Sequence, residues 1–278
     1  MSTIISPQDF TKTTSLLRSF FSDHRGFLEV HTQNRLSILA ACEDPTTVST
    51  YDYSGEIWPL PQTGQMWLEY ELLNDPSLPG VFCVSTSYRQ EQNPIAGRHD
   101  LIFPMFEFEM LGDMNDMIEL EKELLVHLGF GARETFHEGN YEDVANKYSV
   151  RELEHEHEER LETDYGKVFI LKSFPNHTSP FWNMMQDKSG LRAKKVDVIM
   201  HGVETIGSAQ RSSDAEEMRA QFYNISDGNY AKILFSNFTK ERVEKELEEF
   251  LAHKFVNRSG GGIGVTRLIR AMKLSNLI

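Results

Sequence analysis

The chain has 278 residues, of which 40% are hydrophobic, as expected for a soluble globular protein with a substantial core. Its 28 basic and 42 acidic residues give a net charge of −14, which argues against nucleic acid as a partner because phosphates are bound by clustered Lys and Arg. No apolar run approaches the ~20 residues that span a bilayer and no signal peptide is recognisable, so we expect a cytoplasmic protein without membrane contact.

The N-terminal part is predicted to contain a helix, a strand, a long loop and a second helix. A Ser-Pro pair at residues 6–7 is typical of a helix start, and apolar residues then recur at helical spacing until Gly26. A strand is expected at 26–32. The irregular stretch 41–65 follows, and loops of that length in compact domains tend to be functional. An apolar helix is predicted near 66–73.

The middle of the chain is predicted to form an antiparallel hairpin from two strand-like runs, 81–89 and 103–111, joined by a polar loop. Several strands with few β-α-β alternations favour one α+β domain spanning 1–278, with an antiparallel sheet flanked by helices. Further helices are predicted at 116–128, 150–165 and 241–251, and further strands at 167–174, 195–202 and 229–236.

The stretch GGGIGVTRLIRAM begins at Gly260 and carries Arg267 in what we expect to be the first turn of a helix. It does not fit a P-loop, which needs GK[ST], or a dinucleotide fold, which needs GxGxxG at the start of a β-α-β unit. Two interpretations remain open. The glycines form either a loop that approaches a phosphate or a strand packed tightly on a helix.

The hairpin sequence SYRQEQNPIAGRHDLIFPMFEFEM gathers two arginines, a histidine, a carboxylate and an aromatic ring. Cations of this kind pair with phosphate oxygens, a carboxylate can accept from an amino group, and an aromatic face suits adenine. The alternative is a solvated hairpin with a charged turn. The residues concerned are Arg89, Glu91, Arg98, His99 and Phe103.

Together, YRQE...RHxxxFxxxExE and GGGIGVTRL resemble the second and third signature motifs of the class II aminoacyl-tRNA synthetases. The resemblance implies an ATP site and Mg²⁺. It implies catalytic roles for Arg89 at the α-phosphate and Arg267 at the γ-phosphate. The other ATP-binding residues that it implies are Phe103 on adenine, Arg98 and His99 near the outer phosphates, Glu91 near adenine or the amino acid, Glu204 through the metal, and Gly264 in the glycine stretch.

Further segments resemble the aspartyl and asparaginyl branch of this family. VDVIMHGVETIGSAQR is similar to a strand and following loop of the asparaginyl enzymes, which implies that Asp197 and Glu204 hold Mg²⁺ and that Arg211 reads the substrate side chain. Oxygen ligands and a fork-shaped cation suit a metal-bound triphosphate and a carboxylate. LPQTGQMWLEYEL resembles the amino-acid loop, in which Gln65 and Glu69 would meet the substrate's polar groups.

The sequence departs from the family pattern at several positions. Gln33 replaces a proline of the first motif, which usually lies at a dimer interface, although a homodimer is still implied. Ile102 replaces a glutamate, and Leu68 replaces the lysine of the aspartyl enzymes. Thr266 replaces an acidic residue, as in the ammonia-dependent asparagine synthetases that share this core. Asp44 either contacts the substrate's amino group or forms an Asx-type turn before Pro45.

The branch usually carries an N-terminal anticodon-binding barrel of ~100 residues, and none is recognisable in this sequence. We therefore expect activation of aspartate as an acyl adenylate that ammonia converts to asparagine, with release of AMP and pyrophosphate. A second hypothesis transfers an activated amino acid to a small molecule, a carrier protein or a tRNA. A third is a non-catalytic, synthetase-like binding module.

Overall fold

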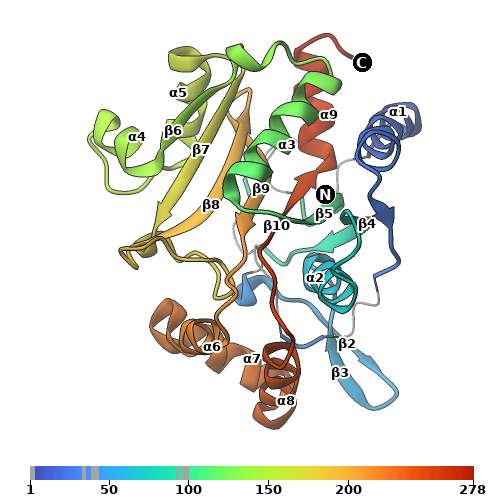
Figure 1. The fold of residues 1–278 in the computed structure, drawn as a ribbon, viewed down its shortest axis with the longest axis vertical. Coiled ribbons are helices and arrows are strands. Elements are labelled where there is room, and N and C mark those ends of the chain that lie inside the picture. The colour runs from blue at the N-terminus through green and yellow to red at the C-terminus, as the bar shows by residue number, and fades with distance from the viewer. Residues whose placement is uncertain (1–3, 33–35, 39–43, 92–93, 96–99) are drawn as a thin grey trace.

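The computed structural model describes residues 4–32, 36–38, 44–91, 94–95 and 100–278. Its centre is an eight-stranded sheet in the order β1-β4-β5-β10-β9-β8-β7-β6, in which only the β1–β4 and β6–β7 pairs are parallel (Figure 1). The strands are β1 Leu28–Glu29, β4 Val81–Tyr88, β5 Ile102–Leu111, β6 His137–Asn140, β7 Val168–Pro175, β8 Arg192–Met200, β9 Val203–Gln210 and β10 Arg258–Gly264, and a separate hairpin pairs β2 Thr50–Tyr53 with β3 Glu56–Pro59.

Helices cover both faces of this sheet (Figure 1). The helices α1, α3 and α9 lie on one face, α2, α4 and α5 lie on the other, and α6, α7 and α8 gather at one end of the molecule. Their bounds are α1 Pro7–Arg18, α2 Gln65–Asn74, α3 Met114–His127, α4 Tyr141–Tyr148, α5 His155–Tyr165, α6 Ala215–Asn224, α7 Asn229–Phe238, α8 Lys240–Leu251 and α9 Val265–Leu274. The predicted α+β class, with a mostly antiparallel sheet, is confirmed.

Alternation along β5 decides which face of the sheet carries polar groups. Phe106 and Phe108 enter the apolar core beneath α3 and α9, whereas Glu107 and Glu109 point to the opposite face. On that face Val81 and Cys83 of β4 stand opposite the two carboxylates and pack against α2. The two glutamates are therefore fully buried between the sheet and α2.

Most predicted elements are confirmed, with two informative errors. The opening helix begins at the Ser6 cap and is extended by a π-helical turn, Ser19–His24, before Gly26. The strand predicted at 229–236 is wrong, because α7 occupies this segment and buries Tyr230, Leu234 and Phe238 along one helical face. The segment after β8 that we expected to be a loop is strand β9.

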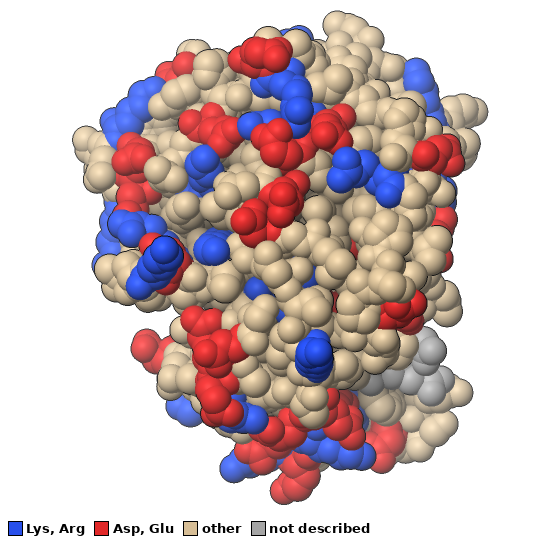
Figure 2. All heavy atoms as spheres, viewed as in Figure 1, with Lys and Arg blue, Asp and Glu red and all other residues tan. Residues whose placement is uncertain are grey.

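The surface carries charges of both signs. On the face shown in Figure 2, Lys and Arg side chains are interspersed with Asp and Glu. Within the described part of the chain, no helix is long and apolar enough to cross a membrane.

Glu121 of α3 has an unusual position for a carboxylate, since it is fully buried against the sheet, where only the Ser208 hydroxyl opposes the effect of burial on its pKa. Burial raises its pKa to about 8. The folded protein therefore keeps a proton that the unfolded chain releases above the ordinary glutamate pKa. The contribution of Glu121 to the free energy of unfolding is therefore greatest below the ordinary glutamate pKa. It falls by roughly 1.4 kcal/mol per pH unit between that pKa and about pH 8.

We expect Glu121→Met to raise the free energy of unfolding at pH 7 by roughly 1–3 kcal/mol, because the variant no longer needs a proton in order to fold. Urea denaturation between pH 4 and pH 8 measures the effect, which should shrink toward acid pH. Glu119→Met, at an exposed position of the same helix, is the control and should leave the pH dependence unchanged. An identical pH slope in the Glu121 variant would contradict this assignment.

Candidate active site

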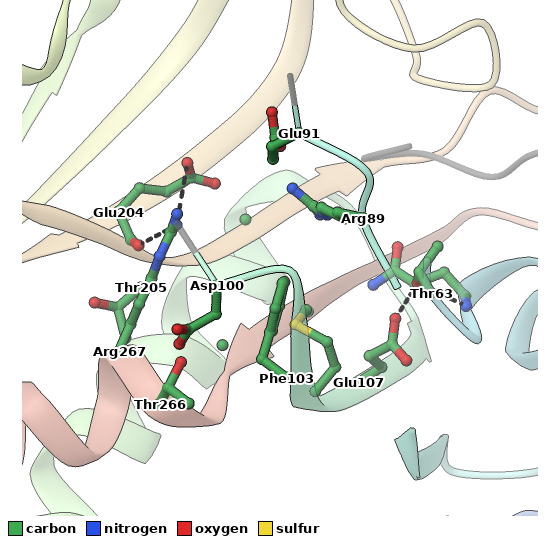
Figure 3. Close-up of a pocket in the computed structure, with 15 residues that line it drawn as sticks. Thr63, Arg89, Glu91, Asp100, Phe103, Glu107, Glu204, Thr205, Thr266 and Arg267 are labelled. Carbon is green, nitrogen blue, oxygen red and sulfur yellow. Dashed lines mark hydrogen bonds and ion pairs between the residues drawn. The ribbon is translucent and has the colours of Figure 1, made fainter. Parts of the chain in front are cut away.

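An open cavity of about 780 Å³, part of which is open solvent, lies on the polar face of the sheet (Figure 3). Its walls come from segments that are distant in the chain: the start of α2, the β4–β5 hairpin, β9, and the junction of β10 with α9. Its lining residues are Thr63, Gln65, Arg89, Glu91, Asp100, Phe103, Met105, Glu107, Glu204, Thr205, Gly207, Gly262, Gly264, Thr266 and Arg267.

The β4–β5 hairpin brings Arg89, Glu91 and Phe103 to the cavity as predicted (Figure 3). The strands pair as far as Tyr88 and Ile102, and the amide of Arg89 then donates to the Leu101 carbonyl oxygen at 2.8 Å. The Arg89 guanidinium carbon lies 5.6 Å from the centre of the Phe103 ring. A cation and an aromatic face thus adjoin on one wall. Arg98 and His99 lie outside the described residues.

Arg267 approaches the cavity from the first turn of α9 (Figure 3). Its Nη1 donates to the backbone carbonyl oxygen of Glu204 at 2.8 Å and lies 3.8 Å from the Glu204 carboxylate. Pairing of β8 with β9 skips Thr205, and this bulge lets Glu204 and Thr205 both line the cavity. Arg267 and Arg89 therefore stand on different walls of one site.

Glu107 is a cavity residue that we did not single out from the sequence. Its carboxylate accepts hydrogen bonds from the Thr63 hydroxyl, the Gly64 amide at 2.9 Å and the Ser85 hydroxyl at 2.5 Å. Burial raises the pKa of this carboxyl group, and the hydrogen bonds partly oppose the shift. The Glu-x-Glu alternation in FEFE was the signal that could have identified it, since it predicts two carboxylates on one face of a strand.

Behind the cavity lies a fully buried network of four charged side chains, which we call the inner network: Glu69, Glu109, Arg211 and Arg258. Arg211 donates from Nε and Nη2 to the two Glu109 oxygens at 3.2 Å each. Arg258 donates from Nε and Nη2 to Glu69 Oε2 at 3.0 and 2.7 Å. Two cations and two carboxylates are thus matched in forked pairs, which lowers the cost of burying them.

The residues predicted to bind the amino acid occupy different depths. Gln65 lines the cavity, and its Oε1 accepts a hydrogen bond from Arg211 Nη2. Arg211 and Glu69 lie one layer further in, outside the lining. Asp44 also lies outside it: the side chain is exposed and accepts from the Thr46 amide at 2.8 Å, as in the Asx-type turn.

Asp197 is buried beside the cavity wall, opposite Gly207 in the sheet, and is not a lining residue. Lys195 Nζ lies 2.9 Å from its Oδ2, while its Oδ1 has no hydrogen-bond partner among the described residues. Burial raises the pKa of Asp197 to about 7, Lys195 opposes the shift and the negative charge of Glu204 adds to it. An unpartnered buried oxygen next to a second carboxylate fits a hard cation such as Mg²⁺.

The glycine stretch is strand β10 at the centre of the sheet, so the predicted strand is confirmed, but its first glycines pack against neighbouring strands rather than against a helix. A Cβ on Gly260 would lie 1.7 Å from Glu109 Oε2, and one on Gly261 would lie 2.6 Å from Ser208 Cβ. These two glycines make room for side chains of the neighbouring strands. Gly262 and Gly264 line the cavity. Of the glycines in this stretch, only these two lie where the backbone could approach a bound phosphate.

Asp100 and Thr266 also line the cavity. Thr266 stood out as a departure from the family pattern, whereas nothing in the sequence distinguished Asp100 from the rest of its polar loop. Figure 3 shows both side chains near the β10–α9 junction. The described lining thus contains two arginines and four carboxylates, namely Glu91, Asp100, Glu107 and Glu204. This excess of negative charge suits a site that also takes a metal cation.

Comparisons with known proteins show the family to which this chain belongs. The family model of the class II tRNA synthetases for D, K and N matches residues 8–278. The cytoplasmic asparagine–tRNA ligase of Mus musculus is 27% identical over 74% of this chain and 43% of its own length. The aspartate–tRNA(Asp/Asn) ligase of Methanopyrus kandleri is 24% identical over 71% of this chain and 51% of its own length. The chain thus spans about half the length of these relatives.

Among solved structures, the asparaginyl-tRNA synthetase of Pyrococcus horikoshii in complex with asparaginyl-adenylate superposes with a TM-score of 0.75. The match covers 95% of this chain and 65% of that one at 20% sequence identity, a level at which the likeness concerns the fold. Because the family model covers nearly all residues, the chain belongs to the class II tRNA synthetase family of the aspartate, lysine and asparagine enzymes.

Proposed function

We propose that this protein activates an amino acid of the aspartate and asparagine type with ATP, and that its reaction is the amidation of aspartate by ammonia. The observation that carries the activation step is the pair of arginines on different walls of one cavity, Arg89 beside the Phe103 ring and Arg267 at the start of α9. A triphosphate bound between two cations, with its base on an aromatic face, presents its α-phosphorus to a second substrate in the same cavity.

In this proposal an oxygen of the substrate carboxylate attacks the α-phosphorus, and the bond to the pyrophosphate group breaks. Arg89 and Arg267 stabilise negative charge on the phosphate oxygens. Asp197 and Glu204 would hold Mg²⁺, which supplies further charge neutralisation when bound. The buried carboxylate of Glu107 is suited to the substrate's ammonium group because it lines the cavity beside Gln65.

Ammonia then adds to the acyl carbon of the adenylate, AMP leaves, and the nitrogen loses a proton to solvent. Thr266 supports this choice of acceptor, because it lines the cavity where most of the family carries an acidic residue. The alternative acceptor is a tRNA, and the relatives support it because they are tRNA ligases. These relatives do not support our argument, based on net charge, against nucleic acid as a partner. A cytoplasmic location and a homodimer remain proposals.

The decisive experiment incubates the purified protein with ATP, Mg²⁺ and aspartate, and measures the exchange of labelled pyrophosphate into ATP. Addition of ammonium should then yield asparagine and AMP in equal amounts. A parallel reaction with transcribed tRNA and no ammonium tests the alternative. Exchange without asparagine formation would reject the ammonia step, and an absence of exchange with both aspartate and asparagine would reject the activation step.

A further inference from the structure

Gln65 determines which hydrogen-bonding group a substrate meets at the inner end of the cavity, the end nearest the inner network. Its carboxamide is only 1% exposed and is held by Arg211, which can only donate hydrogen bonds. The Gln65 carbonyl oxygen must therefore face Arg211, and its NH₂ group faces away. Gln65 Nε2 has no hydrogen-bond partner among the described residues, and Gln65 lines the cavity. The group available to a substrate here is a hydrogen-bond donor.

Glu69, one helical turn after Gln65 on α2, is the carboxylate that could have offered an acceptor. Arg258 donates two hydrogen bonds to Glu69 Oε2, and Asn183 Nδ2 donates one to Glu69 Oε1 at 2.7 Å. Arg258 is itself fixed, since its Nη1 donates to the Ser212 carbonyl oxygen at 3.0 Å. Both oxygens and the charge of Glu69 are thus engaged by groups of the protein.

We infer that Arg258 makes the inner end of this cavity select a substrate carboxylate over a carboxamide, because it pairs with the negative charge of Glu69. A carboxylate only accepts hydrogen bonds, whereas a carboxamide brings two N–H donors that would need acceptors. The inference rests on the proposed function and sharpens it: the substrate carries two carboxylates, one that is activated and one that is held near Gln65. This chemistry favours aspartate over asparagine.

The Arg211–Glu109 pair is compatible with a second carboxylate in its neighbourhood. Burial raises the pKa of Glu109 to about 7, against the opposing effect of Arg211. Arg211 Nη2 also donates to Gln65 Oε1, so the guanidinium adjoins the residue that lines the cavity at this point. Arg258 then acts as a positioning residue behind the site, without touching the substrate.

The test compares aspartate with asparagine in two measurements: kcat/KM in ATP–pyrophosphate exchange, and calorimetric binding without ATP. The wild type should prefer aspartate. Arg258→Met exposes the charge of Glu69 and should lower the aspartate-to-asparagine ratio by at least about tenfold. Glu69→Gln should raise the ratio, and the double variant should return it toward the wild-type value. Arg219→Met, which removes the partner of Glu248 on α8, is the control and should leave the ratio unchanged.

A purely structural role for Arg258 predicts no such rescue. The inference is overturned if the wild type prefers asparagine or if the three variants share the wild-type ratio. If Arg258→Met does not fold, Glu69→Gln and the double variant still decide. If no exchange occurs with either amino acid, the proposed function fails while the calorimetric ratio still tests the inference. Absence of both exchange and binding with either amino acid would overturn both.

Discussion

An Arg267→Ala variant is expected to lose ATP–pyrophosphate exchange by roughly 10²–10³-fold, the effect of removing one preorganised group that stabilises developing charge. Arg267 is placed for this role by the first turn of α9 and by its hydrogen bond to the Glu204 carbonyl oxygen at 2.8 Å. The measurement is the exchange rate at saturating amino acid, with kcat and the KM for ATP determined separately.

Arg270→Ala is the matched control for this experiment. Arg270 lies one turn later on α9, is exposed and donates to the His201 carbonyl oxygen at 3.2 Å, away from the cavity. Its loss should leave exchange essentially unchanged. Wild-type exchange in the Arg267 variant would show that the two-arginine geometry is not the ATP site.

Gly260→Ala is expected to destabilise the protein by more than about 3 kcal/mol or to prevent folding. The added Cβ would lie 1.7 Å from Glu109 Oε2 and 2.5 Å from the Phe108 carbonyl oxygen, both on the paired strand β5. The Glu109 side chain cannot move away without breaking its two hydrogen bonds with the buried Arg211 guanidinium. The Phe108 carbonyl oxygen and the Glu109 side chain, which is held by Arg211, therefore leave no room for the added Cβ.

Gly264→Ala provides the comparison within the same strand. The nearest atom to its added Cβ is Arg267 Cδ at 3.5 Å, an ordinary contact, and its φ of −69° suits any residue. We expect its urea midpoint to match that of the wild type. Equal midpoints for the Gly260 variant and the wild type would mean that β10 tolerates a side chain at this position.

Local patterns in the sequence predicted most of the elements near the site. Alternation in FPMFEFEML predicted strand β5 and the hairpin that carries Arg89 and Phe103, and the cap at Ser6 predicted the first helix. The error at 229–236 arose because its apolar residues suit either period, and packing of Leu234 and Phe238 against the apolar side chains of α6 and α8 selects the helix.

The same limit applies to the glycine stretch and to the amino-acid end of the site. Nothing local distinguishes a glycine that approaches a phosphate from one that clears a neighbouring carboxylate, as Gly260 does for Glu109. Arg258 was not singled out either, because its significance depends on Glu69, a residue far away in the chain. Arg211 and Glu69 were identified by resemblance, but their depth behind Gln65 was not.

The sequence by itself determined the α+β class and most strand and helix positions, because these depend on residue type and on short-range periodicity, which the linear chain contains. Resemblance to the motifs of a known family indicated which arginines, carboxylates and aromatic residue accompany an ATP-type motif. Only the tertiary structure decided that β10 is a packed central strand, that Asp100 and Glu107 line the cavity, and that Arg258 pairs with Glu69. A side chain becomes buried or ion-paired where distant segments of the chain meet. Its partners and its depth are therefore properties of the folded molecule.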